Sequence, residues 1–301
     1  MTNPKHLAGA SLIELMIALS IGIIVTLAVS VAYISGSRLQ GSQSELLTIS
    51  ESGRSALLAL GTDIVRAGYR NGDALYFSAP PFPPGTQRVT GTDSNSTVDT
   101  STDSYPSDTI SISYYGENDL SSEPPAAATP TNTADESMRD CHGELINRNI
   151  RADITYGVVT ISNVPWLYCT VTHTETTGGT ATSTDICATP SNCGLVANVE
   201  ALQFLYGVDS DEDGIINIYE RGENLTDETR EQITSVQVSL VVKGDSPTTR
   251  EFSKASDIDM FGYEYTSFAE NDDIGSTYAV PATDGHARRV FVSEFFLRNR
   301  G

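Results

Sequence analysis

An almost unbroken apolar run over residues 12–34 is the strongest pattern in the chain. Its length matches the roughly 20 residues that a helix needs to cross the ~30 Å hydrocarbon core of a bilayer. One charged residue, Glu14, interrupts the run near its start. Because a carboxylate inside a membrane-length segment is costly, we expect Glu14 to have a function. The run therefore predicts a membrane-spanning helix with one functional acid.

Apolar residues continue beyond this run at steps that are sums of three and four, which places them on one helical face. The predicted stripe consists of Leu39, Leu46, Ile49, Leu57, Leu60 and Ile64, widened by Leu47, Leu58 and Val65. Gly68 is expected to end the helix as a C-cap. The pattern predicts one helix from about residue 11 to 67 whose second half packs on a soluble domain. A break near Gly36, followed by a separate helix, is the alternative.

Alternating apolar positions further along the chain predict β-strands over residues 109–115, 153–162, 166–175, 198–207 and 233–243. The polar or Pro-rich stretches predict long loops over 70–108, 121–137, 176–192 and 244–287. Trp166 is the only tryptophan and is expected to anchor the core. Since loops join most strands, antiparallel pairing is expected. The predicted fold class is α+β, with a long N-terminal hydrophobic helix packed on an antiparallel β-sheet domain with long loops.

The charge balance limits the partners of the chain. Lys and Arg number 18 against 39 Asp and Glu, which gives a net charge of -21. Such a surface repels nucleic acid and anionic lipid, and no basic stripe is present, so we expect no nucleic-acid partner. No nucleophile-elbow, zinc-protease or phosphate-binding glycine motif occurs, so an enzyme is not expected.

The four cysteines are expected to form disulfides, because the number is even and the apolar helix implies export. Three pairings exist, and the sequence alone does not choose among them. We pair Cys187 with Cys193, which enclose five residues, and Cys141 with Cys169. The alternative is a zinc site with the ligands Cys141, His142, Cys169 and His173.

Residues 209–220, DSDEDGIINIYE, have the ligand spacing of an EF-hand calcium loop. The predicted ligands are the side chains of Asp209, Asp211, Asp213, Asn217 and Glu220 and the carbonyl of Ile215. Gly214 falls where the loop bends sharply. Hard oxygen ligands favour Ca²⁺ over a transition metal. The flanking residues indicate strand rather than helix, and a solvated acidic turn is the alternative to a bound Ca²⁺.

The segment Gly9-Ala10-Ser11-Leu12-Ile13-Glu14-Leu15 resembles the class III signal of type IV pilins and type II secretion pseudopilins. The resemblance implies that a prepilin peptidase removes the leader 1–9 by cutting after Gly9 and methylates the new amino terminus at Ala10. Phe is commonest in the family at the position of Ala10. Family members are thought to pair the carboxylate at the position of Glu14 with the amino terminus of a neighbouring subunit.

Three further segments resemble the PilW type of minor pilins. The segment 50–72, SESGRSALLALGTDIVRAGYRNG, matches the PilW-type helix stretch at most positions, with Ser50, Arg66 and Gly72 as departures. Residues 206–209, YGVD, and the ending from Arg288 to Asn299 match as well. The implied domains are the leader 1–9, a transmembrane or fibre-core helix 10–35, its amphipathic continuation 36–68 and a globular β-rich pilin domain 69–301.

The resemblance implies a structural subunit for type IV pilus assembly or initiation and for pilus-dependent motility or adhesion. Its implied partners are other minor pilins, the major pilin, a large pilus-tip adhesin and the prepilin peptidase. The subunit would sit in the inner membrane with a periplasmic domain before assembly, and in the extracellular fibre or tip afterwards. The alternatives are a Ca²⁺-dependent pilus-tip adhesin module and a J-type minor pseudopilin of type II secretion.

Overall fold

The computed structural model describes residues 11–70, 89–92, 107–117, 134–177, 180–247, 257–265, 276–280 and 285–298. The described residues fall into two compact units, one ending at Leu47 and the other beginning at Thr48. The leader, including Gly9, and the new amino terminus predicted at Ala10 lie outside the described residues.

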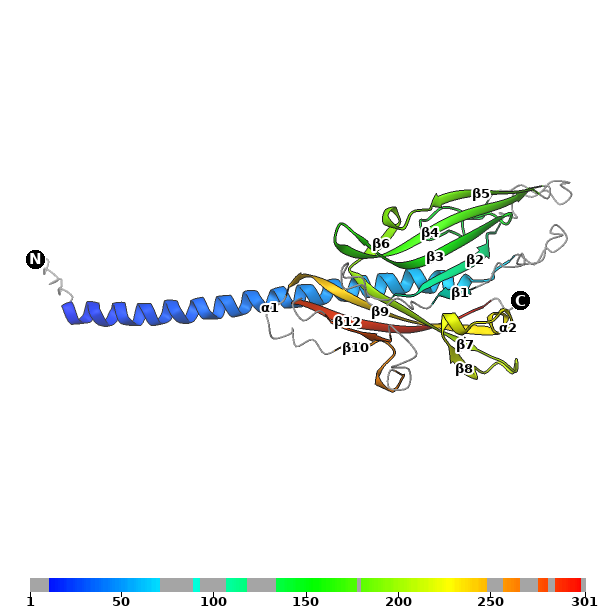
Figure 1. Cartoon of the computed structure of the whole chain (residues 1–301). Coiled ribbons are helices and arrows are strands. Elements are labelled where there is room, and N and C mark those ends of the chain that lie inside the picture. Colours follow the sequence, from blue (N-terminus) through cyan, green and yellow to red (C-terminus); the bar gives the residue numbers. More distant parts are fainter. Residues whose placement is uncertain are drawn as a thin grey trace, which may run out of the picture. The chain divides into compact units, whose positions relative to one another are not determined.

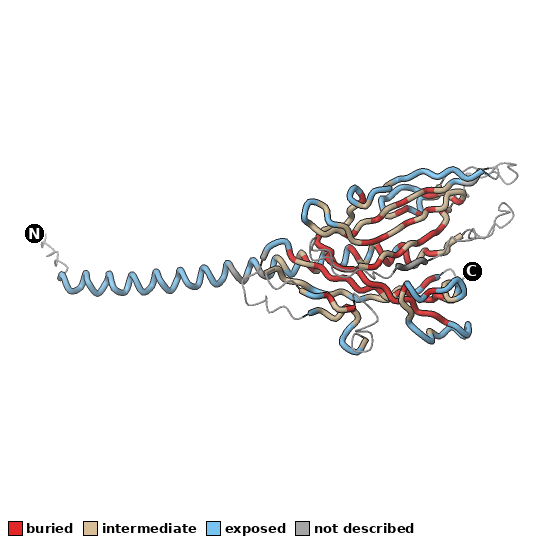
Figure 2. The backbone as a smooth tube through the Cα atoms, in the orientation of Figure 1, coloured by how far each residue is buried: buried red, intermediate tan, exposed pale blue. Residues whose placement is uncertain are grey.

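Helix α1 (Leu12–Arg66) is one continuous helix, so the alternative of a break near Gly36 is not observed. Its first part, Leu12–Ser37, has a mean hydropathy of 2.6, and none of it is buried. Length and composition make this the one helix among the described residues that could cross a membrane. Figure 2 shows this part of α1 as exposed along its length.

The end of α1 is fixed by Gly68, as the sequence predicts. Gly68 has a φ of 75°, in the left-handed region that favours glycine. Its amide donates to the carbonyl of Ser113 at 2.9 Å, and the amide of Tyr115 donates to the carbonyl of Tyr69 at 2.9 Å. The helix end is therefore tied directly to strand β2 (Thr109–Tyr115).

Two larger antiparallel sheets make up most of the second unit (Figure 1). The first has the order β1-β2-β3-β4-β5, with β6 also paired to β4; its strands are β1 (Val89–Thr92), β2, β3 (Ile150–Ile161), β4 (Val164–Thr177), β5 (Thr180–Cys187) and β6 (Gly194–Ala197). The second has the order β12-β9-β7-β8, with β7 (Val199–Val208), β8 (Ile218–Glu220), β9 (Ile233–Pro247) and β12 (His286–Phe296). The small pair is β10 (Ile258–Asp259) and β11 (Thr277–Tyr278), and the short helices are η3 (Pro190–Asn192), η4 (Gly222–Asn224) and α2 (Asp227–Glu231).

The α+β class and the antiparallel pairing are confirmed, but several predicted loops contain strands. Strand β5 lies inside the predicted loop 176–192, and β8 lies inside the acidic stretch. Seven of the eight β5 residues are exposed, so no apolar alternation marks this strand. Backbone hydrogen bonds to β4, which a sequence pattern does not reveal, hold it in place.

The core-facing stripe of α1 differs from the predicted one. Ile49, Leu60 and Ile64 are buried as predicted, whereas Leu46, Leu47 and Leu58 are exposed, so their inclusion in the stripe is wrong. The rest of the buried stripe consists of small residues and one acid, namely Gly53, Ala56, Gly61, Asp63 and Ala67. Small residues contribute little apolar surface, so hydrophobic periodicity does not mark them, yet they let the backbone of α1 approach the sheets closely.

The two glycines of this stripe face phenylalanines of strand β12, which we call the closing strand. A Cβ at Gly53 would collide with the ring of Phe291, and a Cβ at Gly61 would collide with the ring of Phe295. The helix segment and the chain ending that resemble the PilW type are therefore in direct contact. In Figure 1, this part of α1 runs between the β2–β6 strands and the β12-β9-β7 strands.

Asp63 connects α1 to the first sheet through a buried polar contact. Its Oδ1 accepts from the Tyr114 hydroxyl at 2.9 Å and its Oδ2 from the Tyr156 hydroxyl at 2.6 Å. Only 2% of Asp63 is exposed. Burial raises the pKa of the Asp63 carboxyl above its usual range, although the hydrogen bonds from both tyrosines and the charge of Arg66 act in the opposite direction.

Asp63→Ala should lower the free energy of unfolding by about 2–4 kcal/mol, because two buried hydroxyls lose their carboxylate acceptor. Denaturant unfolding of the full-length chain measures this loss. Asp63→Asn keeps one acceptor oxygen and should lose less, and Thr62→Ala, at the exposed neighbouring position, should lose almost nothing. Equal losses in all three variants would refute the role given to Asp63.

The raised pKa of the Asp63 carboxyl also makes the stability of the fold depend on pH. The folded state holds the Asp63 proton more tightly than the unfolded chain, so stability falls as pH rises from the ordinary carboxyl value of 3.8 through the raised folded value. Relative to Asp63→Asn, the wild-type chain should therefore lose stability across this window. A difference between the two proteins that does not change with pH would contradict the assignment.

The closing strand β12 is held by a second buried charge. Glu200 on β7 accepts from Arg288 Nε at 2.6 Å and from Arg288 Nη2 at 3.0 Å, a bidentate contact. The Tyr278 hydroxyl donates to Glu200 Oε2 at 2.6 Å, and Lys243 Nζ lies 3.4 Å from Oε1. This network joins β7, β9, β11 and β12 around one carboxylate.

Trp166 is not the core anchor that the sequence analysis predicts. Buried Leu167, Cys169 and Val171 alternate along β4 with Trp166 and Tyr168, which are only partly buried. Trp166 thus lies on the outer face of the first sheet. The core instead contains Tyr114, Tyr156, Tyr206 and Phe204 as its largest side chains.

Candidate functional site

Glu14 lies in the first turn of α1, where the helix dipole favours a negative charge. The amide of Glu14 donates to the carbonyl of Ser11 at 3.0 Å, so the helix begins immediately before it. The side chain is exposed, as is the apolar surface that surrounds it. The apolar surface of this part of the helix is of the kind that a membrane or another protein covers. Once it is covered, the Glu14 carboxylate needs a polar or charged partner, because an isolated charge in an apolar environment is unfavourable.

The acidic loop closes a hairpin between β7 and β8. Asp209, at the end of β7, is 2% exposed. Its Oδ1 accepts from the amide of Asp213 at 3.1 Å and its Oδ2 from the amide of Gly214 at 2.9 Å. Gly214 has a φ of 93°, which places the bend where the sequence predicts it.

Three of the predicted calcium ligands come together in this loop. Carboxylate oxygens of Asp209, Asp211 and Asp213 lie within 4.8 Å of one another. The other two predicted side chains are not part of this group: Asn217 Oδ1 accepts from the Ser210 amide at 2.7 Å, and Glu220 lies in β8 opposite Tyr206. The Ile215 side chain is 67% exposed. The loop therefore presents a three-carboxylate cluster, with the closing Glu220 outside it.

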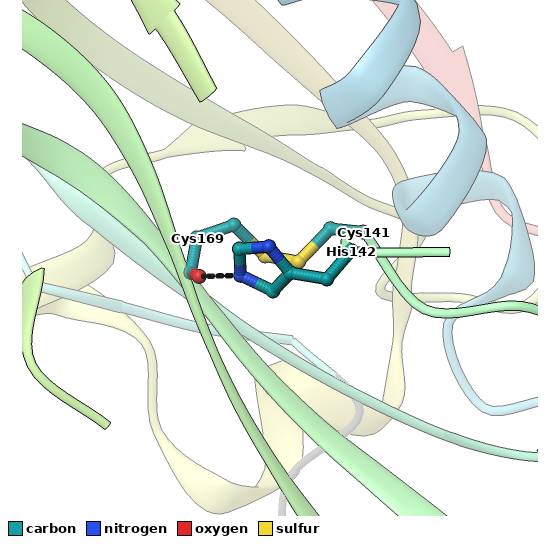
Figure 3. A group of neighbouring side chains, drawn as sticks. All are labelled: Cys141, His142 and Cys169. Atoms are coloured by element: carbon teal, nitrogen blue, oxygen red, sulfur yellow. Dashed lines mark hydrogen bonds between the residues drawn. A yellow bond between two sulfur atoms is a disulfide. The ribbon is translucent and has the colours of Figure 1, made fainter. Parts of the chain in front are cut away.

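Both predicted disulfides are present, Cys141–Cys169 and Cys187–Cys193. The alternative zinc site is wrong, because its two sulfurs are bonded to each other and its histidines have other partners. His142 Nε2 lies 2.7 Å from the carbonyl oxygen of Cys169 (Figure 3). His173 Nε2 lies 3.0 Å from Asp140 Oδ2 in a buried pair.

The Asp140–His173 pair fixes the loop that carries Cys141. Asp140 Oδ1 accepts from the amides of His142 at 2.9 Å and Glu144 at 3.0 Å. Burial alone would raise the pKa of the Asp140 carboxyl, but the hydrogen bonds from His173 and from these two amides hold it below its usual range. This cluster is a structural support for the disulfide.

The partners in the buried polar contacts of the fold are not evident from the sequence. Asp63 lies in a recognised segment, but nothing in the sequence identifies Tyr114 and Tyr156 as its partners. Glu200 follows the apolar Val199 at the start of a strand. An acid at such a position is the one feature of the sequence that could indicate a buried charge. Its partner Arg288 lies 88 residues away in the chain.

The long apolar helix and the antiparallel sheets form an α+β arrangement like that of a type IV pilin, and a family comparison agrees with it. The family model described as type IV pilus-assembly protein W matches residues 155–299. The matched range includes the acidic loop and strand β12. The match supports the interpretation of the chain as a type IV pilus minor pilin of the PilW type.

A solved structure of a type IV-like pilin from Thermus thermophilus is similar, with a TM-score of 0.39 and 12% sequence identity. The similarity covers 83% of this chain and 97% of that chain. Among curated proteins, none gives a significant match. The family is one of structural pilus components.

Proposed function

We propose that the chain is a minor pilin that prepilin peptidase cuts after Gly9 and that then enters a type IV pilus, supporting its assembly and the motility or adhesion that depends on it. The observation that carries this proposal is the exposed apolar helix Leu12–Ser37 with the single acid Glu14, continuous with the spine of a folded domain. Other pilus components would cover that helix in the fibre.

The proposed pairing of Glu14 follows from the cost of an isolated charge. An unpaired carboxylate in lipid or in an apolar fibre core is unfavourable, and an amine at Ala10 of a mature subunit would be a partner of opposite charge. The pairing would favour helices that meet with the amino terminus of one beside Glu14 of another. Other minor pilins and the major pilin supply such termini.

Deletion of the gene tests the proposed role. The deletion should reduce surface pili and twitching, and the unaltered gene should restore both. Normal piliation with lost secretion of exoproteins would instead identify a J-type pseudopilin. Normal piliation with lost attachment would favour the adhesin role. Either result would overturn the assembly role.

We also propose that the acidic loop binds Ca²⁺, supported by the convergence of Asp209, Asp211 and Asp213 within 4.8 Å. Three carboxylates this close repel one another, and a hard divalent cation removes that repulsion. Asp209 is already held by two backbone amides of the loop. Closure of the shell by Glu220 would require the loop to tighten around the ion.

Ca²⁺ should raise the unfolding temperature of the full-length chain in detergent. A free concentration of 100 times the dissociation constant corresponds to about 2.7 kcal/mol of stabilisation. Asp211→Ala should abolish the shift, whereas Asp227→Ala, which removes an exposed carboxylate in α2, should retain it. A wild-type chain that shows no Ca²⁺-dependent shift and no heat of binding would refute the site.

A further inference from the structure

Strand β4 carries one continuous row of side chains on the outer face of its sheet. Buried residues alternate along it with five partly exposed ones, Trp166, Tyr168, Thr170, Thr172 and Thr174. The four intervals of two residues, at ~3.3 Å per residue, make the row roughly 26 Å long. The row is therefore shaped for an extended ligand rather than for a compact one.

The two aromatic rings of this row each lie beside a glycine of a neighbouring strand. A Cβ at Gly157, on β3, would lie 2.7 Å from the Tyr168 hydroxyl and 2.8 Å from its Cζ. A Cβ at Gly194, on β6, would lie 3.0 Å from Trp166 Cε3. Each ring thus lies next to a glycine, and a larger residue at the position of that glycine would displace the ring.

Two of the three threonines of the row are held in place by neighbouring polar side chains, and Thr170 donates to the carbonyl of Thr155 at 3.4 Å. Thr172 donates to Asp185 Oδ1 at 2.8 Å, and the hydroxyls of Thr174 and Ser183 lie 3.2 Å apart. A hydroxyl has one donor and two acceptor positions, so each threonine keeps hydrogen-bonding capacity toward a ligand. Side chains that are already ordered lose less entropy when they bind.

The charges select among the extended ligands that could use such a row. Asp153, on the neighbouring strand, is paired with Arg151 at 2.8 Å, whereas the carboxylate of Asp185, which accepts from Thr172, adds a negative charge beside the row. The whole chain carries a net charge of -21, which repels polyanions such as nucleic acids and acidic glycans. A neutral chain with apolar ring faces and many hydroxyls fits both the aromatic and the threonine positions.

We propose that this row binds an extended, neutral polysaccharide. Sugar rings would stack on Trp166 and Tyr168, and their hydroxyls would bond to Thr170, Thr172 and Thr174. This inference goes beyond the assembly role and does not depend on it. A subunit exposed on a pilus could use the row to contact a glycan-covered surface.

The single tryptophan makes the test direct, since the intrinsic tryptophan fluorescence of the chain comes from Trp166 alone. Full-length chain in a detergent without a sugar headgroup would be titrated with cellohexaose, a neutral extended hexamer. The emission of Trp166 should change saturably. Tyr168→Ala should weaken binding about tenfold, as loss of one stacking ring implies, and Thr172→Val should weaken it roughly fivefold, as loss of one hydrogen bond implies.

Matched variants separate a lost contact from a lost fold. Tyr168→Phe keeps the ring and should bind as the wild type does, and Tyr263→Ala removes an aromatic side chain that is 77% exposed elsewhere and should also bind normally. The acidic hexamer of galacturonate should not bind. The proposal is overturned by no emission change up to about 10 mM cellohexaose, by unchanged binding in Tyr168→Ala and Thr172→Val, or by equal binding of the acidic hexamer.

Discussion

Glu14→Ala should leave the chain processed and membrane-bound but remove it from pili. The substitution deletes the one charge in the apolar run, so insertion into the membrane becomes easier, not harder. Assembly becomes harder, because the amine of a neighbouring subunit then has no partner in the fibre core. Loss of one member of a buried pair costs about 3–5 kcal/mol, which corresponds to more than a hundredfold in an equilibrium constant.

Quantitative blotting of membrane and sheared-pilus fractions measures this effect. Glu51→Ala provides the control, since Glu51 is an exposed acid on the same helix but outside the apolar segment. It should distribute as the wild type does. Glu14→Asp, which keeps the charge on a shorter side chain, should recover part of the incorporation. Normal incorporation of the alanine variant would show that Glu14 has no part in assembly.

Arg288→Ala should be among the most destabilising single changes in the folded domain. It leaves the buried Glu200 carboxylate with Lys243 at 3.4 Å and the Tyr278 hydroxyl, but without its bidentate partner. We expect a loss of about 3 kcal/mol in the free energy of unfolding. The adjacent Arg289→Ala is the matched control: Arg289 is exposed and lies 5.3 Å above the ring of Phe291, a contact worth about 0.5–1 kcal/mol.

A double variant tests the reason for that loss. Glu200→Leu combined with Arg288→Leu removes both charges, so no carboxylate is left buried without its partner. This variant should be more stable than Arg288→Ala in denaturant unfolding of the full-length chain. If the two variants at Arg288 and Arg289 lose equal stability, or if the double variant is the least stable, the network around Glu200 does not hold β12.

The sequence predicted the helix and its end better than the surface on which it packs. The apolar run and Gly68 act through local backbone preferences, which a sequence pattern shows directly. The packing of Gly53 against Phe291 depends on a residue 238 positions later, and the exposure of Leu58 follows from where the sheets lie. Hydrophobic periodicity alone therefore predicted that large residues such as Leu58 are buried, whereas several of the buried positions hold small residues such as Gly53.

The strands, too, were predicted only where a local sequence pattern marks them. Apolar alternation located β2 within residues 109–115, its observed bounds. It could not locate β5, whose side chains are exposed on both faces, and it misplaced Trp166, because a large aromatic side chain is usually buried. The acidic loop was located by its spacing, but the spacing did not predict that Asn217 would bond to Ser210.

The two recognised segments at 50–72 and 288–299 gain a physical meaning in the fold. Gly53 and Gly61 accept the rings of Phe291 and Phe295, and Asp63 joins the same helix to the first sheet. The residues of these two segments therefore make contacts that pack the sheets of this domain against its helix.

The most direct test of the central claim is the amino-terminal sequence of the chain recovered from sheared, purified pili. The account predicts a mature chain that begins at Ala10 with a methylated amine and is present in the pilus fraction. It also predicts that the Glu14→Ala chain has the same amino terminus but remains in the membrane fraction. A wild-type chain that retains residues 1–9, or that is absent from purified pili, would contradict the assignment as a pilus subunit.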